Sequence, residues 1–314
     1  MSSMRKTAVA AVLTLASLGG AKAVDAADPI TTYRSEKVDG ISIFFREAGP
    51  SNAPTILLLH GFPSSSHMFR DLIPKLAIRY HVVAPDYPGF GYSDAPSHAV
   101  FNPTFDDLTR VMEDFVEQRG IKRATMYLQD FGGPVGFRMA VDHPEWVDAL
   151  VIQNANAYVE GLAPNIKEAT EARAKQPAPV DQLSFELGKG LTDLLYLQGA
   201  SNPSRISPDS WNLDLWAMGE PGHKEIAAAL LNDYQSNVDD YPRWQAYLRK
   251  YQPKTLVLWG RGDPVFLPSG AEAFRRDLKS VQITYFDAGH FALEQESGAM
   301  ATEILAFLDA QIAR

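Results

Sequence analysis

The segment MYLQDFGGPVGF (residues 126–137) joins an apolar run to a glycine-rich turn, and the carboxylate of Asp130 stands where the two meet. Glycine at positions 132 and 133 permits a tight turn, and Pro134 suits the first turn of a helix because that position needs no N–H. In one interpretation, Asp130 simply caps the helix that follows. In the other, the segment is a nucleophile elbow, a strained strand-to-helix turn that presents a reactive side chain, with aspartate where serine is commoner.

Six short apolar runs alternate with longer amphipathic stretches along the chain. Near-continuous apolarity of this kind is typical of parallel strands that are buried on both faces. The predicted strands span residues 55–61, 80–87, 124–130, 148–156, 254–263 and 281–290, and the predicted helices span residues 69–78, 105–119, 134–143, 271–278 and 294–312. Residues 31–40 and 41–49 have the pattern of an antiparallel edge hairpin. Together these patterns predict a doubly wound, mostly parallel α/β sheet.

The strand–helix alternation stops between residues 158 and 251. This stretch contains helical patterns, joints rich in proline and serine, and most of the tryptophans, but no candidate strand. We therefore predict a core formed by residues 30–157 and 252–314, interrupted by a helical cap over residues 158–251.

Residues 1–26 have the pattern of a signal peptide. Arg5 and Lys6 provide the positive start, an apolar stretch follows, and small residues offer cleavage sites that end at Ala23 or Ala26. An uncleaved membrane anchor is the alternative, although the apolar stretch is shorter than the roughly 20 residues that a spanning helix needs. We predict export to the periplasm or beyond the cell, without stable membrane insertion after cleavage.

The composition narrows the range of partners. The chain has 46% hydrophobic residues, no cysteine and a formal net charge of −9. It can therefore bury a sizeable core, cannot form disulfides or a thiolate metal site, and is unsuited to nucleic acid or an anionic membrane surface. No pair of histidines has metal-ligand spacing, and no glycine-rich phosphate loop is convincing. We expect an apolar small molecule and water as partners, with no metal and no cofactor.

Ligands of open α/β sheets bind beyond the carboxyl ends of the strands, and three further signals lie there. The turn HGFP (60–63) exposes the backbone N–H of Phe62, which could stabilise an oxyanion. Asp263 and His290 follow the last two predicted strands, where a carboxylate could hold an imidazole. Alone, each could be an ordinary turn residue or a structural histidine. Their order after Asp130 is nucleophile, acid, histidine, which makes a catalytic triad the favoured interpretation.

With these residues in view, the chain resembles the α/β-hydrolase superfamily from about Lys37 to the C-terminus. The resemblance is carried by HGFP, DYPGFGYSD (86–94), QDFGG (129–133), GRGDP (260–264) and GHFALE (289–294). It is specific for the branch with an aspartate nucleophile, which contains epoxide hydrolases and haloalkane dehalogenases. It implies an eight-stranded sheet with helices on both faces, attack of Asp130 on an sp³ carbon, and hydrolysis of the ester by water that His290 and Asp263 activate. The backbone N–H groups of Phe62 and Phe131 would form the oxyanion hole.

The leaving group separates the two activities within this branch. Dehalogenases typically place a tryptophan after the nucleophile and often a side-chain donor after the His-Gly turn, but Phe131 and Phe62 stand there. Epoxide hydrolases supply an acidic O–H from cap tyrosines, and the stretch LLNDYQSNVDDYPRW resembles theirs. We therefore predict an epoxide hydrolase whose leaving-group donors are Tyr234 and Tyr196. The residues expected to contact the substrate are His60, Trp211 and Trp216.

Two alternatives stay open. A cap tryptophan (Trp211, Trp216 or Trp244) could donate to a halide, which would make the protein a haloalkane dehalogenase. A non-catalytic ligand-binding protein of the same fold is the other alternative. The chain also departs from the epoxide-hydrolase pattern at Leu128, where glycine is common, and at Gln129, where the family usually has histidine.

Overall fold

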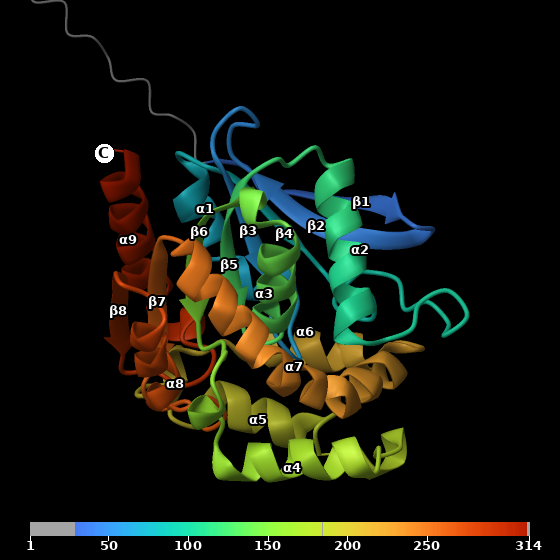
Figure 1. Ribbon diagram of the computed structural model, residues 1–314. Coiled ribbons are helices and arrows are strands. Elements are labelled where there is room, and N and C mark those ends of the chain that lie inside the picture. Colours follow the sequence, from blue (N-terminus) through green and yellow to red (C-terminus); the bar gives the residue numbers. More distant parts are fainter. Residues whose placement is uncertain (1–28, 184, 313–314) are drawn as a thin grey trace, which may run out of the picture.

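The computed structural model describes residues 29–183 and 185–312, so the predicted signal peptide lies outside the described residues (Figure 1). Within these two ranges, no helix combines the length and apolarity that crossing a membrane requires.

The centre of the molecule is one eight-stranded sheet with the order β1-β2-β4-β3-β5-β6-β7-β8. The first hairpin and the β2–β4 pair are antiparallel, and the remaining neighbours are parallel. The strands are β1 (Thr32–Val38), β2 (Ile41–Ala48), β3 (Thr55–Leu59), β4 (His81–Pro85), β5 (Ala124–Gln129), β6 (Val147–Gln153), β7 (Thr255–Gly260) and β8 (Val281–Phe286). This confirms the predicted fold class, because the continuously apolar strands β4, β5 and β7 are buried along their whole length.

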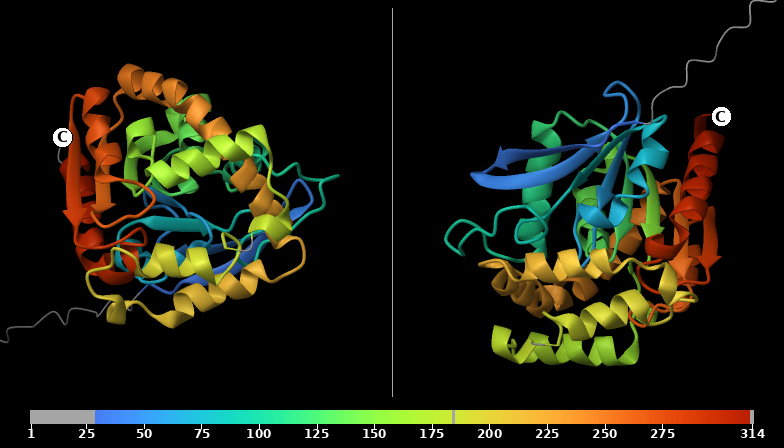
Figure 2. Two further views of the ribbon diagram at one scale, coloured as in Figure 1. Left: turned by 90° about the horizontal axis from the view of Figure 1, so that it is seen from below. Right: turned by 180° about the vertical axis from the view of Figure 1, so that it is seen from behind.

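Helices cover both faces of the sheet (Figures 1 and 2). Helices α1 (Ile73–Ala77) and α9 (Leu293–Ile312) pack on one face, and α2 (Phe105–Gln118), α3 (Gly132–Asp142) and α8 (Pro268–Ala273) on the other. Thr104 caps α2 by accepting a hydrogen bond from the N–H of Asp107 at 3.2 Å, and the acidic first turn suits the helix dipole. The helix predicted for residues 69–78 is shorter than expected, because the chain first forms a 3₁₀ turn over Ser66–Phe69.

The segment between β6 and β7 contains four α-helices within the described residues: α4 (Pro164–Lys175), α5 (Lys189–Leu197), α6 (Pro208–Met218) and α7 (His223–Tyr251). We call this segment, residues 158–251, the cap. Figure 1 shows α4, α5 and α6 gathered at one end of the sheet, with α7 running from them alongside the core, and the right-hand view of Figure 2 shows the cap from behind. Helix α7 joins the two parts, because it packs against α4 as well as α2 and α3.

A polar cluster ties the cap to the core. Arg70 donates two hydrogen bonds to the carboxylate of Glu294, at 2.9 and 2.7 Å. Ser210 on α6 accepts from Arg70 at 3.0 Å and donates to Glu294 at 2.7 Å. A bidentate, charge-assisted pair with a third partner is more specific in geometry than a simple surface pair. The α6 side of the cap is therefore anchored on the core.

The departure at Leu128 has a packing explanation. A Cβ atom at Gly136 on α3 would lie 2.0 Å from Cδ2 of Leu128, so the leucine fills the space that the glycine leaves. Helix α3 thus approaches β5 closely, which fixes the helix behind Asp130.

Candidate active site

Asp130 lies in the sharp turn between β5 and α3. Its φ of 47° is in the left-handed region, which is strained for a residue with a side chain. A Cβ atom at Gly132 would lie 2.1 Å from the carbonyl oxygen of Leu59, so only glycine permits this close approach. The N–H of Gly133 closes the turn by donating to the carbonyl of Asp130 at 2.8 Å. This geometry is that of an elbow, so the simple helix cap is the wrong interpretation of the segment.

The two carboxylate oxygens of Asp130 have different surroundings. Oδ1 accepts a hydrogen bond from the backbone N–H of Phe62 at 2.6 Å, and the N–H of Phe131 also bonds to the carboxylate. Oδ2 lies 3.7 Å from Nε2 of His290. Burial raises the pKa of Asp130, while His290 and the two N–H groups act in the opposite direction by favouring the ionised form.

His290 is fully buried and is held by Asp263. Its Nδ1 lies 2.9 Å from Oδ2 of Asp263. Burial alone lowers the pKa of His290, but the charge and hydrogen bond of Asp263 and the charge of Asp130 outweigh this, so the pKa is raised. The imidazole therefore has a carboxylate that fixes its ring and stabilises its cation, as the sequence predicted for this pair.

Asp263 has a further partner that the sequence analysis missed. Its Oδ1 accepts from the N–H groups of Val265 and Phe266, at 2.8 and 3.0 Å, and its Oδ2 also accepts from Nδ2 of Asn154 at 2.7 Å. Asn154 follows β6 and has a φ of 42°. Its position at the end of a strand is the feature of the sequence by which it could have been predicted as a site residue. Four hydrogen bonds, including that of His290, thus hold the Asp263 carboxylate.

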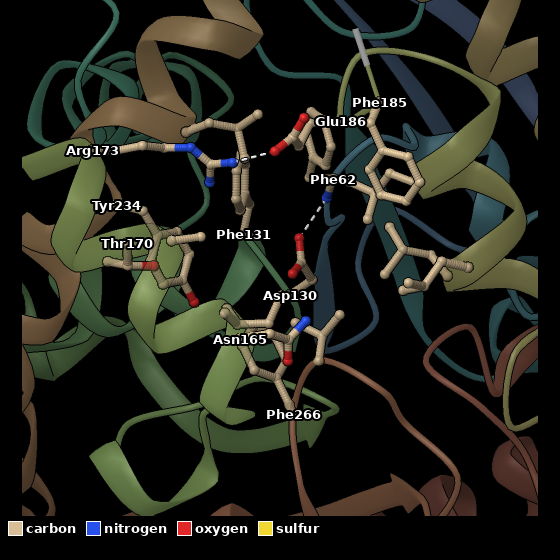
Figure 3. Close-up of a pocket in the computed structure, with 17 residues that line it drawn as sticks. Phe62, Asp130, Phe131, Asn165, Thr170, Arg173, Phe185, Glu186, Tyr234 and Phe266 are labelled. Carbon is tan, nitrogen blue, oxygen red and sulfur yellow. Dashed lines mark hydrogen bonds and ion pairs between the residues drawn. The ribbon is translucent and has the colours of Figure 1, made fainter. Parts of the chain in front are cut away.

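A cavity of about 180 Å³ lies above Asp130, between the core and the cap (Figure 3). For comparison, an engineered cavity of about 150 Å³ holds benzene, so the space suits a small apolar molecule. The lining residues are mostly apolar; they are Phe62, Asp130, Phe131, Asn165, Ile166, Ala169, Thr170, Arg173, Phe185, Glu186, Leu191, Leu194, Leu195, Leu231, Tyr234, Val265 and Phe266.

Tyr234 on α7 reaches this cavity, as predicted for a cap tyrosine. Its ring centroid lies 6.0 Å from that of Phe131, and its side chain is buried. Burial is the main cause that raises the pKa of Tyr234 well above its ordinary value, with further contributions from Tyr241 and Asp130. The hydroxyl therefore stays protonated near neutral pH, and the neighbouring hydroxyl of Tyr241 also favours this form.

The other predicted tyrosine, Tyr196, does not line the cavity. Its hydroxyl donates to Oδ2 of Asp214 at 2.5 Å, and its ring stacks on Phe291 with centroids 4.2 Å apart. The assignment of Tyr196 as a leaving-group donor is therefore wrong, because its proton is already committed to a buried carboxyl group.

The three residues predicted to contact the substrate also lie elsewhere. Trp211 packs against Tyr196, and Trp216 is half-exposed beside Tyr92. His60 is fully buried below the site, where Nε2 accepts the N–H of Tyr87 at 3.2 Å and burial lowers the pKa to about 3. The prediction is wrong for all three, because their side chains stabilise the cap surface or the core and do not reach the cavity.

The polar part of the cavity wall was not predicted. Figure 3 shows Thr170 and Arg173 on the same side of Asp130 as Tyr234, and Arg173 pairs with Glu186. Thr170 and Arg173 belong to α4, whose sequence PNIKEATEARAK has the pattern of a solvated helix. Ile166 and Ala169 lie on its inward face, but this apolar pair is too short a pattern to identify that face from the sequence.

Within residues 29–183 and 185–312, no group of three or more histidine, aspartate or glutamate side chains has the arrangement of a metal site. The groups near the cavity that could take part in a reaction include a carboxylate, an imidazole–carboxylate pair, a tyrosine hydroxyl and a backbone N–H.

Comparison with known proteins identifies the class to which this site belongs. The family model of the α/β hydrolase fold matches residues 54–297, which is well over half of the chain. The protein therefore belongs to the α/β hydrolase fold family, and the residue at its elbow is an aspartate, Asp130. It is a hydrolase related to the haloalkane dehalogenases.

Individual relatives extend this result. The chain is similar to the uncharacterized hydrolase YNR064C of Saccharomyces cerevisiae, with 39% identity over 87% of this chain and 95% of the yeast protein. It is 37% identical to a haloalkane dehalogenase of Bradyrhizobium diazoefficiens over 42% of this chain and 39% of that protein. A crystal structure of an ancestral haloalkane dehalogenase has the same fold, with a TM-score of 0.75 and 22% identity over 90% of this chain and 100% of that one.

Proposed function

We propose that the protein hydrolyses small epoxides to vicinal diols through an alkyl ester on Asp130. The observation that carries this proposal is the placement of a buried, protonated Tyr234 at the same small cavity as the free oxygen of Asp130. An O–H donor suits an epoxide oxygen, which becomes an alkoxide as the ring opens. The residues beside the carboxylate, Phe62 and Phe131, offer no side-chain N–H to a halide.

In the first step, Oδ2 of Asp130 forms a bond to one ring carbon. The bond between that carbon and the ring oxygen breaks, and the oxygen takes the proton of the Tyr234 hydroxyl. The free lone pairs of Oδ2 make it the attacking atom, since Oδ1 is held by the N–H of Phe62. The product of this step is a hydroxyalkyl ester.

In the second step, water attacks Cγ of the ester while Nε2 of His290 takes a proton from it. The negative charge develops on Oδ1, where the N–H of Phe62 stabilises it, and the N–H of Phe131 favours negative charge on the same carboxylate. The bond from Cγ to Oδ2 then breaks, and the alkoxide takes the proton from His290. The new carboxyl group of Asp130 then gives its proton to the Tyr234 phenolate, which restores both side chains. The net reaction is epoxide plus water to diol.

Hydrolytic dehalogenation is the second candidate function. Asn165 places a side-chain N–H donor at the cavity, and a relative of this chain is named a haloalkane dehalogenase. The two candidates share the ester on Asp130 and differ only in the leaving group. A non-catalytic ligand-binding protein is the third candidate, and it would form no ester.

The test is a panel of small terminal and styrene-type epoxides beside matched bromoalkanes. We expect the wild type to form diols, Asp130→Asn to be inactive, and Tyr234→Phe to lose epoxide turnover about 100-fold or more. In His290→Gln, the ester on Asp130 should accumulate and be seen as added mass. Halide release without diol formation would replace the epoxide proposal by the second candidate, and an unmodified Asp130 would favour a ligand-binding protein.

We also propose that the protein is exported after removal of residues 1–26. N-terminal sequencing of the protein made from the full-length chain tests this: a start after Ala23 or Ala26 supports it, and an intact Met1 contradicts it.

A further inference from the structure

Gln129 ends β5 and precedes Asp130, and its side chain is wedged against the imidazole of His290. Gln129 is fully buried, and its amide nitrogen lies 3.1 Å from Nε2 of His290. A Cβ atom at Gly61 would lie 2.1 Å from Oε1 of Gln129, so the glycine makes room for the carboxamide. This oxygen is buried and has no hydrogen-bond partner within the described residues.

The contact involves the basic nitrogen of the ring. Since Nδ1–H donates to Asp263, the neutral imidazole has its lone pair at Nε2, and the amide of Gln129 donates to that lone pair. When Nε2 takes a proton it becomes a donor and needs an acceptor. Oδ2 of Asp130, at 3.7 Å, is too far away to accept this hydrogen bond.

The unpartnered oxygen of Gln129 meets this need. The terminal torsion of a glutamine has a broad, roughly two-fold preference, so a half-turn exchanges nitrogen and oxygen in nearly the same space. After that half-turn, Oε1 would accept the new N–H of His290. The carboxamide of Gln129 can therefore donate a hydrogen bond to the neutral imidazole and accept one from the protonated imidazole.

We propose that Gln129 is a positioning residue that turns its carboxamide as His290 gains a proton, which frees the Nε2 lone pair for the proton of water, and so governs hydrolysis of the ester rather than its formation. The inference rests on the two-step reaction proposed above. It does not depend on the leaving group, because only the second step moves a proton to His290: the water O–H bond breaks, its oxygen bonds to Cγ, and its proton binds Nε2.

The sheet offers a matched control. Gln153 on β6 lies opposite Gln129 in the strand register and is equally buried. Its amide nitrogen donates to the backbone oxygen of His290 at 3.2 Å, and its oxygen accepts from Tyr127 at 2.5 Å. Gln153→Leu removes a comparable buried amide but leaves the imidazole contact intact.

The experiment is a single turnover followed by rapid quenching and mass measurement of Asp130. In Gln129→Leu, the ester should form at the wild-type rate and disappear about 10- to 100-fold more slowly, the effect of losing a hydrogen bond to a charged group. In the isosteric variant Gln129→Glu, the added charge stabilises protonated His290, so the acid limb of the hydrolysis rate should move to higher pH. Gln153→Leu, which removes only a contact to the backbone of His290, should leave the ratio of ester formation to ester hydrolysis and the pH profile unchanged.

The outcomes separate this inference from the proposed reaction. An ester that forms and disappears with wild-type rate and pH dependence in both Gln129 variants overturns the role of Gln129 alone. Slower ester formation and slower hydrolysis to the same extent in both Gln129→Leu and Gln153→Leu would also overturn it, by indicating a purely structural role. Absence of any ester, in the wild type and in His290→Gln, overturns the two-step reaction itself.

Discussion

Oδ2 of Asp130 lies 3.7 Å from Nε2 of His290, whereas Oδ1 of the same carboxylate is held at 2.6 Å by the N–H of Phe62. The longer distance leaves the lone pairs of Oδ2 available for a bond to carbon. The shorter one directs Oδ1 to donors that stabilise negative charge. The two oxygens of one side chain are thereby prepared for different tasks.

The raised pKa of His290 predicts an acid limb in the rate of ester hydrolysis. Only the neutral ring accepts a proton from water, so kcat should fall as the pH drops through this pKa. Asp263→Asn removes the charge that raises the pKa, so the limb should move to lower pH while kcat on the plateau falls at least about 100-fold. Asp277→Asn is the control, because this buried acid binds Tyr158 away from the site. A limb that stays in place in Asp263→Asn would contradict the assignment.

Phe131→Trp should shift the balance of activities toward halide release. The Phe131 ring lines the cavity beside Asp130, and an indole at this position would add an N–H donor for a halide. We expect bromide release to rise about tenfold relative to diol formation, as measured on matched substrates. Phe105→Trp adds the same bulk at a residue that contacts Phe131 but does not line the cavity. An equal shift in both variants would show that bulk, not the donor, is responsible.

Glu186→Gln should change the charge preference of the cavity. The variant leaves Arg173 without its partner at an otherwise apolar wall. We expect KM to rise for neutral substrates and to fall about tenfold for substrates with a terminal carboxylate, since the guanidinium then takes the substrate as its counterion. Asp193→Asn, which breaks an exposed pair on α5, should leave both values unchanged. Identical KM values for the two substrate types in Glu186→Gln would refute this role of the pair.

The raised pKa of Asp214 predicts that the free energy of unfolding falls as the pH rises. Burial raises its pKa to about 8 in the folded protein, against about 3.9 in an unfolded chain. Between these pH values the unfolded state has released the proton and the folded state has kept it, so the free energy of unfolding falls as the pH rises. From pH 5 to pH 7, urea titration should show the wild type losing over about 1 kcal/mol more than Asp214→Asn. Equal losses would exclude the contribution of Asp214.

The sequence was sufficient to predict the fold class and the three residues at the reactive end of the site, Asp130, Asp263 and His290. Asp130 and Asp263 follow strands that are buried along their whole length, and His290 follows the partly buried edge strand β8. The carboxyl ends of these parallel strands meet at one edge of the sheet. Local turn chemistry, such as the glycines after Asp130, adds a second signal at the same place. These features depend on short segments and on the order of strands and helices, both of which can be predicted from a single sequence.

The walls of the cavity could not be predicted in this way. Tyr234 and Tyr196 are both buried cap tyrosines, and only the docking of the cap helices decides which of them reaches Asp130. Thr170 and Arg173 belong to a helix whose apolar face is weak, formed by Ile166 and alanines, so its inward face becomes clear only when α4 packs on α7. His60 was misplaced for a related reason: its neighbour Gly61 faces the site, whereas its own ring stacks on Tyr87.

The inequality of the two Asp130 oxygens has a consequence for where the atoms of the product originate. Oδ2 bonds to the substrate carbon and stays with it when water enters at Cγ. In heavy-oxygen water, the first product released by each molecule of enzyme should therefore carry an unlabelled oxygen, while the label enters Asp130. The protein gives one of its own atoms to each product and replaces it from the solvent.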